Sequence, residues 1–168
     1  RKLGGLDEAF FAHMEEIDLC WRVKRAGYRI LYVPGSTVYH VGGGSLDREN
    51  PKKLFLNFRN NGRMLIKNTP GGRLFWLLPL RFGLDVLAAL RELAAGRRDM
   101  ASAAWRGSTD TWRNLRFWLR NARATQELIE ANRYAPDRSQ APGWYHGSII
   151  WQFFVRGRKT WRAVMGLE

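Results

Sequence analysis

Hydrophobic side chains recur at helical spacing near the start of the chain. Their intervals of four, three and four residues define one helix face, formed by Phe10, Met14, Ile17 and Trp21. Asp7 is a suitable N-cap at the beginning of this segment, and Gly27 is a suitable stop after two basic residues. The pattern therefore predicts a helix between Asp7 and Gly27.

The pattern changes after Gly27. Residues 28–33 are rich in aromatic and β-branched side chains, and residues 37–41 form a second, shorter run of the same kind. Pro34 and Gly35 separate the two runs, and a glycine-rich loop follows over residues 42–45. We therefore expect a short β pair here.

Helical spacing returns further along the chain. Asn50 and Pro51 are typical of a helix start, and that helix should run to about Asn68. From Leu74 onward the pattern is helical almost throughout, with breaks expected at Gly96, at Gly107 and over residues 135–143. A helix over residues 109–130 should carry an apolar seam, formed by Trp112, Leu115, Leu119, Ala122 and Ile129 with Gln126 among them. A parallel stripe of arginines should flank that seam, formed by Arg113, Arg116, Arg120 and Arg123.

Charge divides the chain into two parts. The 28 Lys and Arg residues outnumber the 15 Asp and Glu residues, giving a net charge of +13. Residues 1–50 are balanced, so the whole excess lies beyond them. A solvated basic face would explain this excess, as would an anionic membrane surface, a phosphate-bearing substrate or nucleic acid. The single cysteine, Cys20, excludes an intrachain disulfide, and no apolar run approaches the roughly 20 residues of a membrane-spanning helix.

Three carboxylates gather at the predicted first helix, on Glu15, Glu16 and Asp18. Acidic side chains near a helix N-terminus stabilise the helix, which is one explanation for the cluster. Asp18 and Arg22 are four residues apart, so they can form an ion pair on one face. The same cluster could supply a general base, so a structural and a catalytic role remain open at this point.

The order of these elements resembles a known family. The run GGLDEAFFAHMEEIDLCWRVKRAGYRILYVPGSTVYHVGGGS is similar to the end of the catalytic domain of bacterial family 2 glycosyltransferases, in particular the rhamnosyltransferase-like group. The similarity extends over residues 3–68, through LNFRNNGRMLIKN, and is weaker beyond residue 71. It implies the C-terminal part of an inverting, GT-A type enzyme. Because the chain starts at Arg1 without Met, we expect it to be a piece of a longer protein.

The resemblance assigns roles to individual residues. It implies that Glu16 is the general base that deprotonates an acceptor hydroxyl, although Glu15 remains an alternative because this chain has Glu where the family has Asp. Asp18 would be a supporting acid. His40 would help to hold Mn²⁺ or Mg²⁺ on the donor diphosphate, and Gly43 and Arg59 could approach its phosphates. The acidic Asp-x-Asp ligands of the family are absent from this chain, so we expect the chain alone to be inactive.

We therefore expect an α/β fragment with two regions. Residues 1–70 would be the C-terminal part of a GT-A catalytic domain, with the catalytic helix and the β pair, and residues 71–168 a basic, Trp-rich, predominantly helical extension. The partners would be a nucleoside-diphosphate sugar and a growing glycan or lipid-linked acceptor, with no specific nucleic acid. Arginine and tryptophan together suit a peripheral location at the cytoplasmic face of the cell membrane. An oligomer is possible, and the alternative function is a basic helical module that binds nucleic acid or protein.

Overall fold

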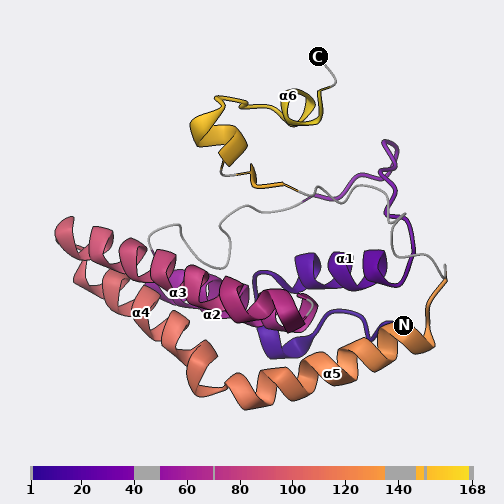
Figure 1. The fold of residues 1–168 in the computed structure, drawn as a ribbon, viewed down its shortest axis with the longest axis horizontal. Coiled ribbons are helices and arrows are strands. Elements are labelled where there is room, and N and C mark those ends of the chain that lie inside the picture. Colours follow the sequence, from indigo (N-terminus) through magenta and orange to yellow (C-terminus); the bar gives the residue numbers. More distant parts are fainter. Residues whose placement is uncertain (1, 40–49, 70, 135–146, 150, 167–168) are drawn as a thin grey trace.

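The fold is described by a computed structural model covering residues 2–39, 50–69, 71–134, 147–149 and 151–166 (Figure 1). A 3₁₀ turn, η1 (Glu8–Phe10), precedes helix α1 (Glu15–Arg25). Four longer helices follow, α2 (Pro51–Asn68), α3 (Gly71–Ala94), α4 (Arg98–Arg113) and α5 (Leu115–Ala131). The C-terminal segment contains a π-helical turn, η3 (Trp151–Val155), and the short helix α6 (Trp161–Met165), which lie apart from the other helices in Figure 1. None of the described helices is long and apolar enough to cross a membrane.

Helix α2 is the central element, because it packs against α1, α3, α4 and α5. Its start is as the sequence predicts: the Asn50 side chain accepts a hydrogen bond from the Lys52 amide at 2.8 Å, and Pro51 occupies the first turn. Trp118 of α5 joins Ile66 of α2 in one buried cluster, together with Leu74 and Leu78 of α3. A second cluster, formed by Leu3, Ala26 and Ile129, fastens the far end of α5 to the N-terminal segment.

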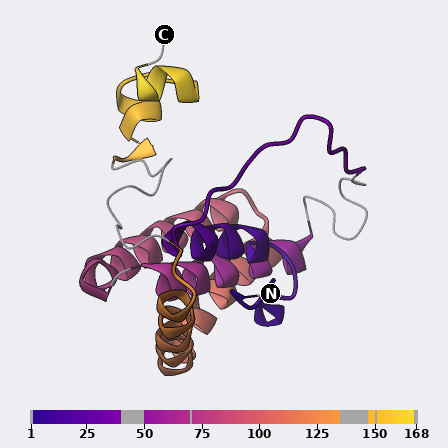
Figure 2. The ribbon, with the colours of Figure 1, turned by 90° about the vertical axis from the view of Figure 1, so that its right-hand side faces the viewer.

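The α/β expectation, the end of a GT-A fold with a short β pair, is wrong for the described residues. Residues 28–39 contain no strand, and Figures 1 and 2 show them extending away from the helices. Leu31 and Tyr32 are 71% and 87% exposed. A strand forms only when its backbone groups pair with a neighbour, and residues 28–33 and 37–39 do not pair with each other or with another described segment. All the regular secondary structure of the described residues is helical.

Three helix boundaries also differ from the prediction. The first helix begins at Glu15, after a 3₁₀ turn that Asp7 caps, so Phe10 does not share a helix with Trp21. Gly107 lies inside α4, where a Cβ would be 2.6 Å from the Phe55 carbonyl oxygen of α2. This glycine therefore permits close helix packing rather than ending a helix. The expected helix over residues 109–130 is broken at Asn114, which divides it into α4 and α5.

This break alters the position of the arginine stripe. The buried residues of α5 are Trp118, Thr125 and Ile129, whereas Leu119 is 40% exposed. At 100° per residue, Arg116, Arg120 and Arg123 lie opposite that buried face, and all of them are exposed. The prediction that these arginines flank the apolar seam is wrong. Helix α5 packs against the other helices through the face that carries Trp118, Thr125 and Ile129, and the arginines lie on the opposite side. The division of the chain at residue 70 stays a prediction.

Candidate functional site

The acidic start of α1 follows a segment of unusual backbone conformation. Phe11, His13 and Met14 have φ angles of 65°, 69° and 74°, in the left-handed region that favours glycine. Such residues each cost on the order of 1–3 kcal/mol and persist only where surrounding contacts hold them. The strained segment ends at Met14, the N-cap of α1, so it sets the direction in which Glu15 and Glu16 leave the turn.

The contacts that hold this segment come from α2. The Asn60 side chain, which is fully buried, donates through Nδ2 to the carbonyl oxygens of Phe10, Ala12 and His13 at 2.9, 2.7 and 2.8 Å. Arg59 adds a hydrogen bond from Nη2 to the Phe10 carbonyl at 2.9 Å. The strained turn is therefore fixed to a rigid helix by two neighbouring side chains, and we name it the Asn60-clamped turn, residues 10–14.

The two glutamates at the start of α1 differ in their surroundings. Glu16 is exposed to solvent, whereas Glu15 is half-buried and its Oε2 has no hydrogen-bond partner among the described residues. His13 Nε2, in the clamped turn, is likewise buried without a described partner. Both side chains occupy the first turn of α1. Glu16 is thus the more accessible of the two candidate bases.

Asp18 serves a different purpose. It is 0% exposed and forms an ion pair with Arg22 at 2.7 Å and with Lys67 of α2 at 3.0 Å. Asn68 donates to its other oxygen at 2.7 Å. Arg22 in turn donates to the carbonyl oxygens of Leu3 and Gly5. Asp18 therefore orients Arg22 and joins α1, α2 and the N-terminal segment, and a contact with an acceptor hydroxyl stays a prediction.

The predicted phosphate ligands are only partly within the structure. His40 and Gly43 lie outside the described residues. Arg59 is described, and its guanidinium faces the clamped turn and lies 5.4 Å from the Phe55 ring centroid. Burial, followed by the charge of Arg63, lowers the pKa of Arg59. Its hydrogen bonds show a role in holding the turn, and contact with a phosphate stays a prediction.

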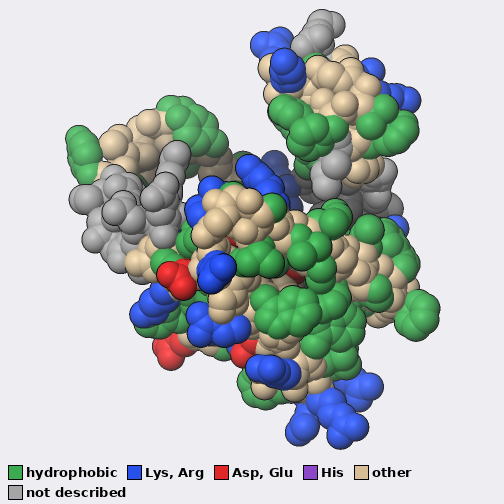
Figure 3. All heavy atoms as spheres, turned by 90° about the vertical axis from the view of Figure 1, so that its left-hand side faces the viewer, with side chains coloured by type: hydrophobic (Ala, Val, Ile, Leu, Met, Phe, Trp, Pro, Cys, Tyr) green, Lys and Arg blue, Asp and Glu red, His purple; other side chains and the backbone are tan. Residues whose placement is uncertain are grey.

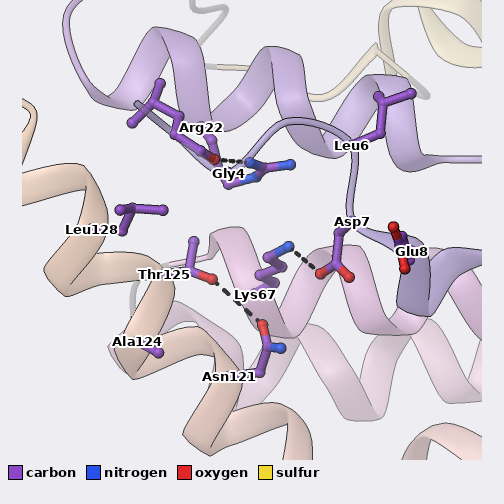
Figure 4. A pocket seen from close by; sticks show the side chains of 11 residues that line it. Gly4, Leu6, Asp7, Glu8, Arg22, Lys67, Asn121, Ala124, Thr125 and Leu128 are labelled. Atoms are coloured by element: carbon purple, nitrogen blue, oxygen red, sulfur yellow. Dashed lines mark hydrogen bonds and ion pairs between the residues drawn. The ribbon is translucent and has the colours of Figure 1, made fainter. Parts of the chain in front are cut away.

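A pocket of about 390 Å³ lies between the N-terminal segment and helices α1, α2 and α5 (Figure 4). Lys67 projects into it from α2 and forms an ion pair with Asp7 at 2.5 Å. Burial raises the pKa of Asp7, but the hydrogen bond and charge of Lys67 outweigh that effect, so this pKa lies below its ordinary value of 3.8. Glu15 and Glu16 do not line this pocket, whose walls are formed by Leu3, Gly4, Leu6, Asp7, Glu8, Arg22, Lys67, Asn121, Ala124, Thr125 and Leu128.

Sequence reasoning missed the residues on α2 that build this region. Asn60 and Lys67 contact residues 7–18 across intervals of 47 to 60 positions. The available signal was their spacing: Leu56, Asn60, Arg63 and Lys67 fall on one stripe of α2, so polar side chains continue the buried face that Leu56 begins.

The described residues do not form a metal centre by themselves. No group of three or more His, Cys, Asp and Glu side chains in the described ranges is placed to hold a metal ion. The predicted Mn²⁺ or Mg²⁺ site depends on His40, outside those ranges, and on ligands that this sequence does not contain. The described residues therefore do not test this site, and the binding of Mn²⁺ or Mg²⁺ stays a prediction.

Comparison with known proteins shows a partial similarity to a glycosyltransferase. The chain is 33% identical over 91 residues to the N-acetylglucosaminyl-diphospho-decaprenol L-rhamnosyltransferase of Mycobacterium tuberculosis, in strains CDC 1551 / Oshkosh and ATCC 25618 / H37Rv. The match covers 54% of this chain and 29% of each relative, so the chain spans less than a third of their length. It matches no protein-family profile and no solved structure. The finding supports a glycosyltransferase-like relationship for this chain.

Proposed function

We propose that this chain is part of an inverting, family 2 glycosyltransferase in which Glu16 is the general base. The reaction would transfer a sugar from a nucleoside-diphosphate sugar to a growing glycan or lipid-linked acceptor. The relative's name specifies an L-rhamnosyl group and a diphospho-decaprenol-linked acceptor, and we propose substrates of the same chemical classes here. A peripheral position at the cytoplasmic face of the membrane, where a lipid-linked acceptor would be found, belongs to the same proposal.

The observation that carries this proposal is the presentation of Glu16. Its carboxylate is exposed on the first turn of α1, directly after a strained turn that Asn60 holds by three hydrogen bonds. A general base must reach the hydroxyl proton in a defined direction, and a fixed helix start provides that direction. The neighbouring acid Asp18 is fully buried and forms ion pairs with Arg22 and Lys67, whereas Glu16 is the exposed carboxylate at the start of α1.

The chemistry follows from this arrangement. Glu16 accepts the proton of the acceptor hydroxyl as the oxygen attacks the anomeric carbon, on the face opposite the departing nucleoside diphosphate. The attack inverts the configuration at that carbon, and the nucleoside diphosphate leaves with the bonding electron pair. A divalent cation, where one is bound, would neutralise charge on the leaving diphosphate.

The test is Glu16→Gln in the full-length protein, with a nucleoside-diphosphate rhamnose as donor and a polyprenyl-diphosphate-linked N-acetylglucosamine as acceptor. The substitution retains size and removes the base, so we expect the rate to fall by roughly 10²–10⁴ with little change in donor affinity. Glu127→Gln, an exposed glutamate of α5 that does not line the pocket, is the matched control and should leave the rate unchanged. A larger loss in Glu15→Gln than in Glu16→Gln would assign the base to Glu15, and transfer at the normal rate in both variants would refute the proposal. The chain alone, without the rest of the protein, should show no transfer.

A further inference from the structure

An ordinary surface helix turns its charged side chains to solvent and its apolar side chains to the core, and the middle of helix α3 does the reverse. Between Leu74 and Leu90 it carries only two charged residues, Arg81 and Asp85. These two form an ion pair at 2.6 Å on the inner side, where Asp85 is 5% exposed and accepts a further hydrogen bond from Ser108 of α4 at 2.8 Å. The charges thus face the other helices, and the solvent side is left without any.

That solvent side is a continuous apolar stripe. Its members follow at intervals of four, four, three and three residues and are 46% to 62% exposed; they are Trp76, Leu80, Leu84, Leu87 and Leu90. At 1.5 Å per residue the stripe is about 21 Å long. Isolated exposed leucines are common, but a stripe of this length marks an interaction surface. We name these five residues the outer face of α3.

The ends of the outer face carry basic side chains. Arg73 and Arg91 are both exposed, and their separation of 18 residues equals five helical turns, so both project on the side of Leu80. The other acid of α3, Glu92, is engaged by Arg97 at 2.6 Å. Figure 3, which faces the end of the molecule where α3 meets α4, shows hydrophobic side chains gathered at its centre and right, with Lys and Arg side chains to their left and below. The surface is therefore apolar along its length and cationic at its ends.

We propose that the outer face of α3 docks on an anionic lipid bilayer, with α3 lying along the membrane surface. Apolar side chains on such a helix enter the boundary between headgroups and acyl chains, while arginines at its ends extend to lipid phosphates. Trp76 lies at one end of the stripe, and an indole ring favours that depth. A protein partner would also cover leucines, but the cationic ends and the chain's charge of +13 match an anionic surface. This inference stands on α3 and does not depend on the proposed reaction.

The first experiment is co-sedimentation of the chain with phosphatidylcholine vesicles, with and without phosphatidylglycerol. We expect binding to the anionic vesicles and a decrease with added salt. The triple variant Leu80→Gln, Leu84→Gln and Leu87→Gln should bind at least about tenfold more weakly, because it removes the apolar contact without changing charge. These side chains are exposed, so circular dichroism should show an unchanged helix content. Absence of wild-type binding at low salt, or equal binding by the triple variant, would overturn the proposal.

A matched pair of charge variants separates this face from general attraction to a basic protein. Arg73→Gln with Arg91→Gln removes two charges at the ends of the outer face, and Arg116→Gln with Arg120→Gln removes two from α5. The α3 pair should weaken binding more than the α5 pair. Equal effects would mean that the net charge alone attracts the chain to the vesicles, and would overturn docking through α3.

A local probe distinguishes the bilayer from a second copy of the chain. In a Cys20→Ser background, Leu84→Cys or Arg120→Cys would carry an environment-sensitive fluorophore. The label at position 84 should shift to shorter wavelength only with anionic vesicles, and the label at position 120 should not shift. If light scattering instead shows a wild-type dimer that the leucine variant converts to a monomer, with no shift on vesicles, the outer face is a dimer interface and the proposal is wrong.

Discussion

Asp18 gives the sharpest test of the packing around the acidic helix. Its Oδ2 receives Arg22 Nε at 2.9 Å, Arg22 Nη2 at 2.7 Å and Lys67 Nζ at 3.0 Å, and its Oδ1 receives the Asn68 amide at 2.7 Å. Every one of these partners is a donor. In Asp18→Asn the new NH₂ group would face a donor in either orientation of the amide, and two buried cations would lose their shared carboxylate.

We expect Asp18→Asn to lower the free energy of unfolding by a large amount, although the two side chains have nearly the same size. Removing one partner of a buried ion pair costs about 3–5 kcal/mol, because the remaining charge stays buried without compensation. Lys67 retains Asp7 at 2.5 Å, so we expect a value near the lower end, about 3 kcal/mol. This is a substantial part of the roughly 5–15 kcal/mol that stabilises a protein of ordinary size.

The assay is urea unfolding followed by circular dichroism. At an m value of about 1–3 kcal/mol/M, the midpoint should fall by about 1–3 M while m stays constant. Glu16→Gln, an exposed carboxylate two positions away, is the control and should change stability by no more than about 0.5 kcal/mol. Adding Lys67→Met to Asp18→Asn should cost less than the sum of the single variants. A loss below about 1 kcal/mol in Asp18→Asn would refute the ion-pair arrangement.

Two further predictions concern helix packing and pH. Gly107→Ala should destabilise the fold by about 1–3 kcal/mol, because its Cβ would lie 2.6 Å from the Phe55 carbonyl oxygen. Gly83→Ala, in α3 with nothing within 4 Å of the new Cβ, should instead stabilise the fold by about 0.5–1 kcal/mol. Urea unfolding measures both variants, and an equal change in their free energies of unfolding would refute the reasoning. Because the pKa of Asp7 is lowered in the folded state, its ion pair with Lys67 should stabilise the fold above the ordinary pKa of 3.8 and lose that contribution as the pH falls through the folded value. Urea unfolding at a series of pH values should thus show wild type and Asp7→Asn converging on acidification, and a gap that stays constant would contradict the assignment.

The success of sequence reasoning depended on the range of the interactions involved. Both ends of helix α2 are predicted correctly. Its start depends on Asn50 and Pro51, whose effects are local. The β pair is wrong because a strand needs a distant or neighbouring partner, and composition alone does not supply one. Gly107 shows a third case: a glycine can end a helix or allow another helix to approach, and the two outcomes have the same local pattern.

In the candidate site, too, contacts between residues close in sequence are predictable and contacts from another helix are not. Glu15, Glu16 and Asp18 are close in sequence, and the predicted pairing of Asp18 with Arg22 is a contact between adjacent helical turns. The clamp by Asn60 and the cation of Lys67 come from another helix, so no local pattern identifies their partners. The strain in residues 11–14 was also unpredictable, because none of the three residues with positive φ is a glycine.

The polar side chains on the inner stripe of α2 contact the N-terminal segment in a regular order, and these contacts explain why the stripe is polar. Lys67 contacts Asp7, Arg63 donates to the Ala9 carbonyl at 3.1 Å, and Asn60 donates to three carbonyls between residues 10 and 13. Successive turns of α2 thus hold successive residues of the N-terminal segment, in antiparallel order. Apolar side chains at these three positions would bury as much surface without the desolvation cost of two cations.

Apolar contacts are not directional, however, and a turn with positive φ values needs directional partners to persist. Hydrogen bonds from Asn60 meet the turn at three carbonyl oxygens, which fixes its position and its conformation together. The same bonds determine where α1 begins, at Glu15, and so where Glu16 lies in its first turn. The stripe on α2 therefore exchanges some stability for a defined placement of the acidic helix start, which is the property that a general base at Glu16 requires.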